Sequence, residues 1–205
     1  MPNKIMKTKS RHKNNLRIAL TGGFCTGKTT VLLIFKSLGA HTFDCDAVAH
    51  RALWKNSPVY KALLRTFGRS IIKRGGRIDR KKLGALVFTN KQKLRMLEKI
   101  IHPYVVSRMH AFFEHTKGLC IAEVPLLFEA RLERHFNRII VVAASNKTIV
   151  ARARSRFPHL SRKEIVSRIT SQLPLERKKK KADFIIHNNE LKKTITQTKH
   201  IWSSL

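Results

Sequence analysis

The chain has 205 residues, of which 43 are lysine or arginine and only 12 are aspartate or glutamate, so its formal net charge is +31. The length suits one compact domain with an inserted lobe or lid, and an apolar content of 42% is enough for a core. No apolar run has the length of a membrane span, and three dispersed cysteines argue against a disulfide framework, which favours a reduced, cytoplasmic setting.

The first fifteen residues are basic and polar, and we expect residues 1–15 to form a short disordered arm ahead of a single domain over residues 16–205. An apolar run from Leu16 then predicts a β-strand, and a second apolar run, over residues 31–38, predicts a helix. Between them lies the pattern Gly-x-x-x-x-Gly-Lys-Thr, which is a phosphate-binding P-loop when it joins a strand to a helix. The residues expected to bind a nucleoside triphosphate are Gly22, Gly23, Phe24, Cys25, Thr26, Gly27, Lys28, Thr29 and Thr30.

The residue types of this loop fit the chemistry of a nucleoside triphosphate. A glycine-rich backbone exposes N–H groups to a phosphate, and the dipole of the following helix points at the same anion. Lys28 is expected to reach the β- and γ-phosphates, and the hydroxyl of Thr29 is expected to bind Mg²⁺. Cys25 is either a tolerated substitution or, if Lys28 and the helix N-terminus lower the pKa of its thiol, a redox-sensitive site.

The region over residues 50–115 contains almost no strand signal. A short strand over residues 40–46 ends in two carboxylates, and helix signals follow it. The helices are expected at residues 47–55, 58–67, 79–88 and 91–115, with Asp79 as the N-cap of the third and an interruption of the fourth at His102 and Pro103. We interpret this region as a helical insertion that carries substrate contacts.

Strand and helix signals alternate in the rest of the chain. Apolar runs over residues 119–124 and 138–143 predict buried strands, and a short strand is expected at residues 183–186. Helices are expected at residues 147–156, 161–173 and 191–202, and the basic run 177–181 is the low-complexity patch. Together with the two earlier strands, this alternation predicts an α/β fold with a five-stranded parallel sheet flanked by helices.

Two aspartates stand at the expected end of the strand over residues 40–46. Ligands of parallel α/β sheets bind at the carboxyl ends of the strands, so Asp44 and Asp46 should lie near the phosphates. Because they are two apart in an extended segment, they should share one face, where Asp46 could take the proton of an acceptor hydroxyl during phosphoryl transfer. The alternative for each is a helix N-cap or turn aspartate.

Two arginines and one glutamate complete the candidate set. Arg152 and Arg156 are four apart on a helix and could neutralise the charge of a transferring phosphoryl group, unless they only form a solvated basic face. Glu123 ends a strand and could act on Mg²⁺ through water, or it is a structural carboxylate. For Asp183 we expect a structural ion pair.

Beyond the P-loop, several segments between residues 17 and 188 form a recognisable series. The most distinctive are Asp44-Cys45-Asp46, His102-Pro103 and the run Pro-Leu-Leu-Phe-Glu over residues 125–129. The others are Ile78-Asp79-Arg80 with Leu83, Arg152 with Arg156, Gln172, and Ala182-Asp183 with Asn188. A P-loop alone is unspecific, but these segments in this order resemble the dephospho-coenzyme A kinase family of P-loop kinases.

This resemblance implies a P-loop NTPase fold with a helical substrate-binding lobe and a helical lid. It implies Mg²⁺-dependent transfer of the γ-phosphate of ATP to the 3′-hydroxyl of the ribose of dephospho-CoA, the last step of coenzyme A biosynthesis. By resemblance, Lys28, Asp46, Arg152 and Arg156 are catalytic, and Asp46 and His102 contact the acceptor. The core then comprises residues 16–49, 116–146 and 182–205, the CoA-binding lobe residues 50–115, and the lid residues 147–181.

Three positions depart from the family pattern without removing a group that the reaction needs. Cys25 replaces a small loop residue, Glu123 stands where aspartate is commoner, and Glu190 stands where glycine is usual. The alternatives are a kinase of another nucleoside or nucleotide, and a basic nucleic-acid-binding protein on a P-loop scaffold. We expect a monomer that uses ATP and dephospho-CoA, has no membrane association, and binds nucleic acid weakly and non-specifically because of its charge.

Overall fold

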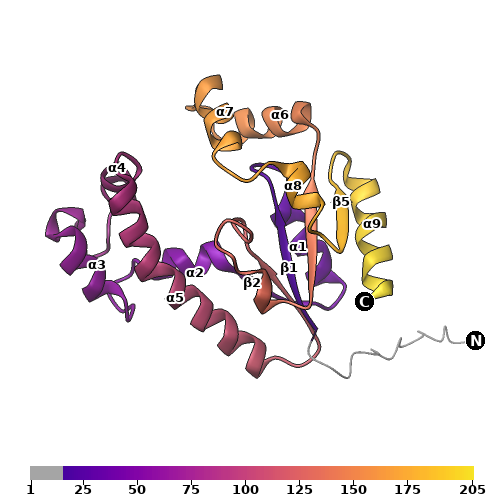
Figure 1. The fold of residues 1–205 in the computed structure, drawn as a ribbon, viewed down its shortest axis with the longest axis horizontal. Coiled ribbons are helices and arrows are strands. Elements are labelled where there is room, and N and C mark those ends of the chain that lie inside the picture. The colour runs from indigo at the N-terminus through magenta and orange to yellow at the C-terminus, as the bar shows by residue number, and fades with distance from the viewer. Residues whose placement is uncertain (1–15) are drawn as a thin grey trace, which may run out of the picture.

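Five strands form one parallel sheet in the computed structural model, which describes residues 16–205 (Figure 1). Their spatial order is β2-β3-β1-β4-β5, so the first strand lies at the centre. The strands are β1 (Leu16–Gly22), β2 (His41–Asp44), β3 (Leu119–Glu123), β4 (Arg138–Ala143) and β5 (Phe184–His187). The expected five-stranded α/β fold is confirmed, whereas the basic arm expected at residues 1–15 lies outside the described residues.

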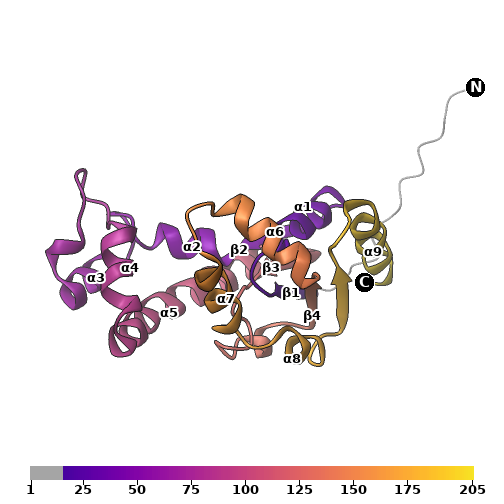
Figure 2. The same ribbon diagram turned by 90° about the horizontal axis from the view of Figure 1, so that it is seen from above.

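Helices cover both faces of the sheet because its central strands are apolar on both sides (Figures 1 and 2). Ile18 and Leu20 of β1 face a cluster with α1 and α9, while Ala19 faces a cluster with α2 and the second half of α5. The helices are α1 (Lys28–Ser37), α2 (Cys45–Arg51), α3 (Tyr60–Phe67), α4 (Arg80–Phe88), α5 (Lys91–His115), α6 (Asn146–Arg156), α7 (Arg162–Thr170), α8 (Leu175–Lys179) and α9 (Leu191–Ser204), with 3₁₀ turns η1 (Arg69–Ile71) and η2 (Glu133–His135).

The helices α3 and α4 and the first half of α5 lie beside the sheet and form a lobe with its own core (Figure 1). Leu63, Ile71 and Leu83 are buried in this core. Asp79 is the N-cap of α4, as expected, because its carboxylate accepts the N–H of Lys81 at 2.8 Å. The lobe is therefore held by apolar packing that does not involve the sheet.

The helix α5 joins the lobe to the sheet without a break. An interruption at His102 and Pro103 was expected, and that prediction is wrong: the helix continues from Lys91 to His115 with Pro103 inside it. Proline removes one backbone hydrogen bond. Leu97 packs in the lobe core before Pro103 and Met109 packs under the sheet after it, so burial on both sides outweighs that loss.

The segment between β4 and β5 lies over the carboxyl ends of the strands (Figure 1). Ser145 caps α6, and Ser161 and Glu164 form a capping box at α7. The helix α8 was not expected, because its sequence reads as a basic run. No helix within residues 16–205 combines the length and the apolar character needed to cross a membrane.

Candidate active site

The phosphate-binding loop joins the carboxyl end of β1 to the N-terminus of α1 (Figure 1). The hydroxyl of Thr26 donates to the carbonyl of Gly23 at 3.0 Å, which closes the loop on itself. Gly27 has a φ of 85°, and Cys25 has a φ of 54°, which is uncommon for a residue with a side chain. Two left-handed residues in one short loop need support from the surrounding structure.

A buried polar network supplies this support. The side-chain amide of Asn188 donates to the carbonyls of Thr26 and Gly27, at 2.9 and 3.3 Å. Arg152 donates to the same Thr26 carbonyl at 3.1 Å, and the hydroxyl of Thr194 donates to Oδ1 of Asn188 at 3.0 Å. A Cβ at Gly27 would collide with the amide of Asn188, so the loop can approach this side chain only with glycine there.

Lys28, which is half-buried, and Glu123, which is buried, are opposite charges under the loop. The ammonium of Lys28 donates to the carbonyl of Gly23 at 3.0 Å. Burial lowers the pKa of Lys28, although the charge of Glu123 opposes this shift. Burial likewise raises the pKa of Glu123, and Lys28 opposes that shift. For each group the cost of burying its charge is larger than the stabilisation it gains from the other. A phosphate near Lys28 and a cation near Glu123 would therefore stabilise the two charged forms.

Thr29 and Glu123 fit the role of magnesium-binding residues. The hydroxyl of Thr29 donates to Oε1 of Glu123 at 3.3 Å, while Oε2 of Glu123 is buried and has no hydrogen-bond partner among the described residues. A hydroxyl beside an orphaned carboxylate oxygen is a donor set that suits a hydrated Mg²⁺. Residues 16–205 hold no group of three or more histidine, cysteine or acidic side chains suited to a metal, so the ion would depend on Thr29, water and phosphate oxygens.

The structure corrects the expected placement of the two aspartates. β2 ends at Asp44, whose carboxylate accepts the N–H of Ala47 at 3.0 Å and caps α2. Asp46 lies in the first turn of α2 rather than on the strand, because this cap starts the helix directly after Asp44. The two side chains remain close: burial and then the charge of Asp44 raise the pKa of Asp46, while Lys28 opposes the shift.

The segment of α6 and α7 contacts the loop through aromatic and arginine side chains. The ring of Phe24 stacks on that of Phe157, with centroids 5.7 Å apart. Arg168 lies over both rings, at 5.9 and 5.5 Å, and Arg156 lies over Phe157 at 5.5 Å. Arg152 and Arg156 also face the loop across a cavity of ≈ 300 Å³, lined by Cys25, Gly27, Thr30, Arg152, Ser155 and Arg156.

The thiol of Cys25 does not have the lowered pKa that a redox-sensitive site would need. Burial raises its pKa, and Arg156, Lys28, Arg152 and Arg168 only reduce the shift. The hypothesis of a lowered pKa is therefore wrong, because desolvation outweighs the nearby cations. The structure therefore favours the other interpretation of Cys25, a substitution that the loop tolerates.

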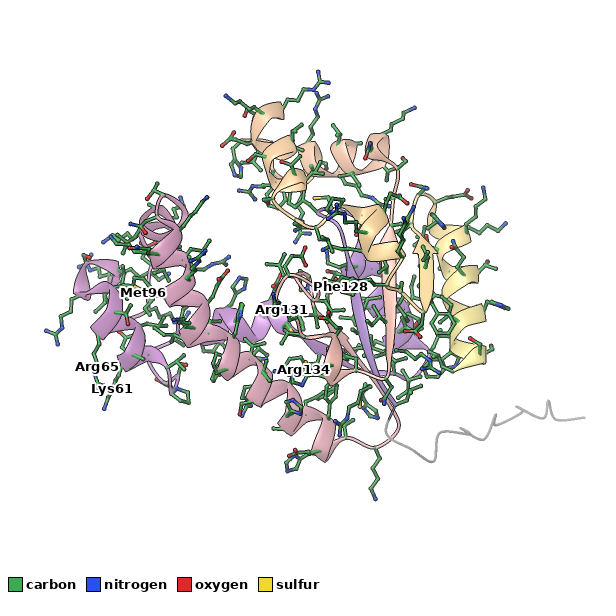
Figure 3. The ribbon with its side chains drawn as sticks, viewed as in Figure 1. Lys61, Arg65, Met96, Phe128, Arg131 and Arg134 are labelled. Carbon is green, nitrogen blue, oxygen red and sulfur yellow. The ribbon has the colours of Figure 1, made fainter. Side chains whose placement is uncertain are left out.

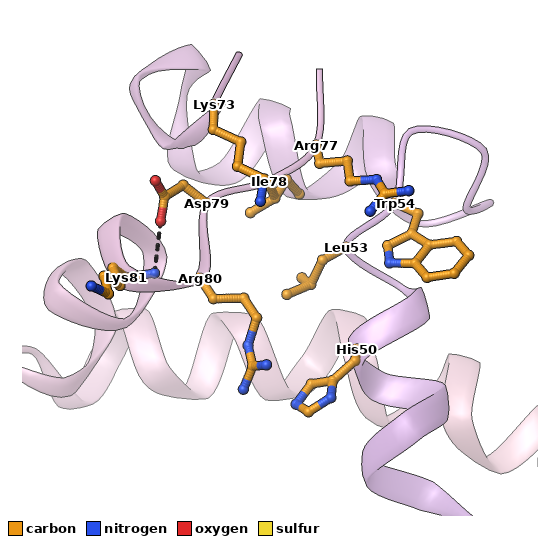
Figure 4. A pocket seen from close by; sticks show the side chains of 9 residues that line it. All are labelled: His50, Leu53, Trp54, Lys73, Arg77, Ile78, Asp79, Arg80 and Lys81. Atoms are coloured by element: carbon orange, nitrogen blue, oxygen red, sulfur yellow. Dashed lines mark hydrogen bonds between the residues drawn. The ribbon is translucent and has the colours of Figure 1, made fainter. Parts of the chain in front are cut away.

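A basic cavity of ≈ 450 Å³ opens in the helical lobe (Figure 4). Its lining residues are His50, Leu53, Trp54, Lys73, Arg77, Ile78, Asp79, Arg80 and Lys81. The carboxylate among them, Asp79, is engaged in capping α4, as the dashed line in Figure 4 shows. His50 and Arg80 point toward one another across the cavity, and both reduce the upward shift of the Asp46 pKa. His50 stands four residues after Asp46 on α2, so the cavity opens about one helical turn from Asp46.

The structure brings most of the expected site residues to one edge of the sheet. These are the P-loop residues with Asp46, Glu123, Arg152 and Arg156. His102 is different: it is exposed on α5 and lines neither the cavity beside the loop nor the basic cavity of the lobe. Its contact with the acceptor stays a prediction. The structural ion pair of Asp183 is confirmed, with Arg138 at 3.7 Å.

One ion pair near the site, in which only the lysine is fully buried, was missed. Lys178 of α8 is fully buried and lies 2.9 Å from Glu129, and it also donates to the carbonyl of Pro125 at 3.4 Å. Glu129 in turn accepts the N–H of Leu173 at 2.8 Å. The available signal was an acid at the end of the apolar run 125–129 in a chain with few acids, which calls for a cationic partner. This pair ties α8 to the segment that follows β3.

Comparisons with known proteins identify the family of this chain. Residues 16–193 match the sequence profile of the family described as dephospho-CoA kinase. A dephospho-CoA kinase of Bacillus cereus is 36% identical over 186 residues, which cover 89% of this chain and 91% of that relative. The match thus extends over the P-loop and the helical lobe alike.

Solved structures give the same result. A Thermus thermophilus protein of known crystal structure has a TM-score of 0.82 at 32% identity, with 93% of this chain and 97% of that chain covered. The dephospho-CoA kinase from Campylobacter jejuni has a TM-score of 0.67 at 28% identity, with 92% and 96% covered. This chain therefore belongs to the dephospho-CoA kinase family.

Proposed function

We propose that this chain transfers the γ-phosphoryl group of ATP to the 3′-hydroxyl of the ribose of dephospho-CoA, giving CoA and ADP. One observation carries the proposal: Lys28, which follows β1, and Asp46, which follows β2, stand at the carboxyl edge of the sheet, where the charge of each acts on the pKa of the other and the basic cavity of the lobe opens beside α2. Membership of the dephospho-CoA kinase family supports the same reaction.

Asp46 is the proposed proton acceptor. The oxygen of the acceptor hydroxyl bonds to the γ-phosphorus, the bond from that phosphorus to the bridging oxygen breaks, and ADP leaves. The proton of the hydroxyl passes to the carboxylate of Asp46. Its raised pKa makes this carboxylate a stronger base than an exposed aspartate, and its position next to Lys28 orients the hydroxyl toward the phosphate.

Lys28, Arg152 and Arg156 are the proposed charge-stabilising groups. All three face the loop, and a guanidinium can donate two parallel hydrogen bonds to phosphoryl oxygens. Arg152 also stabilises the shape of the loop, since its guanidinium donates to the carbonyl of Thr26. We propose that α6 to α8 act as the lid, with the stack of Phe24 on Phe157 as its contact with the loop.

Thr29 and Glu123 are proposed to hold Mg²⁺. The hydroxyl of Thr29 would be a direct ligand, and the orphaned oxygen of Glu123 would accept a hydrogen bond from a water on the ion. When bound, Mg²⁺ neutralises charge on the β- and γ-phosphates.

The basic cavity of the lobe is the proposed acceptor site. Dephospho-CoA carries a diphosphate, and the cavity presents Lys73, Arg77 and Arg80 with a single carboxylate that already caps a helix. Trp54, which is 47% exposed with Arg77 over its ring at 5.0 Å, offers a flat surface for the less polar part of the molecule.

The wider cellular picture is also a proposal. We propose a cytoplasmic monomer whose three cysteines stay reduced, since Cys25, Cys45 and Cys120 are all free thiols. Weak non-specific binding to nucleic acid would follow from the net charge of +31 and should vanish as salt rises.

The test is an ADP-release assay with Mg-ATP and dephospho-CoA, with mass spectrometry of the product. We expect the product to gain one phosphate, and kcat/KM to fall about 100-fold in Asp46→Asn, the scale of losing a general base. Asp183→Asn, at the other edge of the sheet, is the matched control and should stay within about twofold.

Two results would contradict the proposal. Phosphate transfer to another nucleoside but not to dephospho-CoA would point to a different kinase. Salt-sensitive RNA binding without any ADP release would favour the nucleic-acid-binding alternative.

A further inference from the structure

A second polar cavity lies at the opposite edge of the sheet from the phosphate-binding loop. It has a volume of ≈ 370 Å³ and is lined by Arg17, His110, Arg134, His135, Phe136 and Asn137. Arg17 is the second residue of β1 and Gly22 is the last, so the extended strand places roughly 16 Å between this cavity and the loop. The cavity is therefore separate from the candidate active site.

The cavity is built from three segments that hold one another. The N–H of Arg17 donates to Oδ1 of Asn137 at 2.9 Å, and the N–H of Asn137 donates back to the carbonyl of Arg17 at 2.8 Å. The guanidinium of Arg17 lies over the ring of Phe113 on α5, 5.4 Å from its centroid. Arg134 comes from the segment between β3 and β4, as does the exposed Arg131 (Figure 3). The Arg17 and Asn137 side of the cavity is thus fixed by backbone and ring contacts, whereas Arg134 is an exposed side chain at its rim.

The charge of the cavity is entirely positive. None of its lining residues is acidic. Within residues 16–205, neither Arg17 nor Arg134 takes part in any of the ion pairs. Two guanidinium groups beside one cavity, without a carboxylate, leave their hydrogen-bond donors available to an anion.

Two histidines add a charge that depends on pH. Nε2 of His110 and Nδ1 of His135 are 3.0 Å apart, with the rings nearly perpendicular at 80°. One of these two nitrogens must donate a hydrogen bond and the other must accept it, so only one of the two facing nitrogens carries a proton. Burial, then His110, then Arg134 lower the pKa of His135. His135 therefore carries less positive charge at neutral pH than an isolated histidine would.

Charged and titratable side chains lie near His135 on three elements. They are Arg17 on β1, His110 on α5, and Arg134 with Glu133 on η2. Glu133 does not line the cavity, although its Oε2 is buried and has no hydrogen-bond partner among the described residues. The field at His135 is consequently dominated by cations, and an anion in the cavity would favour its protonated form.

We propose that this cavity is a second anion site that binds a phosphate group, free or as the end of a phosphate monoester, through Arg17, Arg134 and the His110–His135 pair. The two guanidinium groups provide the permanent charge. His135 makes the site stronger as the pH falls, because the anion is attracted to its protonated imidazole, which His110 holds in place at 3.0 Å.

The binding test uses NMR of the histidine imidazoles in the full chain, with the P-loop saturated by a non-hydrolysable ATP analogue and Mg²⁺. His110→Gln and His135→Gln assign the two resonances. Titration with inorganic phosphate, and in a second arm with glycerol 3-phosphate, should shift both resonances. The two arms show whether the phosphate group is sufficient or the ester body adds affinity, and either result supports the site.

Two variants isolate the role of the cavity. Arg134→Gln should weaken phosphate binding about tenfold, the scale of one charge-assisted hydrogen bond. Arg131→Gln removes an exposed charge from the same segment without touching the cavity, and it should change affinity by less than about twofold. Kinase activity should be unchanged in both, because the cavity lies away from the loop.

The pH dependence is measured with sulfate, which stays a dianion where phosphate titrates. Sulfate should bind more tightly at about pH 6 than at about pH 8, and it should raise the pKa of His135. The proposal is overturned if millimolar phosphate moves neither histidine resonance. It is equally overturned if Arg134→Gln binds phosphate as well as Arg131→Gln does.

Discussion

The phosphate-binding loop and the helical lobe are held in place by different forces. In the loop, side-chain hydrogen bonds from Asn188 and Arg152 converge on the carbonyl of Thr26. In the lobe, apolar side chains such as Leu63 and Ile71 form a core, and the charged residues lie outside it. The loop must hold residues in a left-handed conformation, and apolar burial is non-directional and cannot specify that conformation. The lobe only has to support charged side chains on its surface, for which an apolar core is sufficient.

This difference predicts two kinds of failure. Loss of a side chain that hydrogen-bonds the loop should affect ATP binding and kcat/KM more than the free energy of unfolding. Loss of a core side chain of the lobe should damage stability first and acceptor binding with it. Three variants test this contrast, beginning with the one that removes the charge of Lys28 at the start of α1.

Lys28→Ala should cause the largest effect on activity. We expect kcat/KM to fall about 1,000-fold, the upper range for loss of one group that stabilises charge in a transition state. The melting temperature should not fall, because burial already disfavours the charged form of Lys28 in the folded chain. The control is Lys36→Ala, at the exposed end of α1, which should leave both quantities unchanged. Activity near that of the unaltered chain would refute the assigned phosphate site.

Leu63→Ala tests the lobe. Leu63 is fully buried in the lobe core, and its truncation should cost about 2–5 kcal/mol of unfolding free energy. In the protein that remains folded, KM for dephospho-CoA should rise while KM for ATP stays unchanged. Leu33→Ala removes an exposed leucine from α1 and should cost little. A rise in KM for ATP instead would mean that the lobe and the loop are not held independently.

Asn188→Ala tests the loop in the same way. Here we expect the KM for ATP to rise and the KM for dephospho-CoA to stay nearly unchanged. It leaves the carbonyl of Thr26 with Arg152 alone and should cost about 1–3 kcal/mol, less than the lobe variant. KM for ATP should rise about tenfold, because the loop loses its fixed shape, and KM for dephospho-CoA should change little. Thr196→Ala, whose hydroxyl only bonds within α9, is the control. Equal losses for both substrates would remove the contrast.

The features that could be predicted from sequence are those whose cause is local. The P-loop, Asp79 as an N-cap, and the strand over Arg138–Ala143 all depend on neighbours along the chain, and the structure confirms each of them. The expected position of Glu123 at the end of a strand is confirmed as well, and its charge acts on Lys28 because parallel strands end at the same edge.

The features that were missed depend on partners far away in sequence. Lys178 reads as one more residue of a basic run, and only the fold brings Glu129 to within 2.9 Å of it. The helix through Pro103 depends on two separate cores that bury its two halves. Residues 45 and 46 could have continued the strand or started the helix. The cap formed by Asp44 starts the helix at once, and this places Asp46 in its first turn.

The smallest predicted effect concerns the two aspartates themselves. The charge of Asp44 is the second cause, after burial, of the raised pKa of Asp46. Asp44→Asn removes that charge and keeps the cap, because an asparagine oxygen accepts the N–H of Ala47 equally well. The pKa of Asp46 should therefore fall.

The sign of the pH effect follows from the role of Asp46. A base works in its deprotonated form, so kcat/KM rises as the pH rises through the pKa of the free enzyme. A lower pKa moves this acidic limb to lower pH in Asp44→Asn, whereas Asp183→Asn, a matched change at the other edge of the sheet, should leave it in place. If Asp44→Asn also leaves the limb in place, then Asp46 is not the group that titrates, and the proton acceptor must be sought elsewhere at the edge of the sheet.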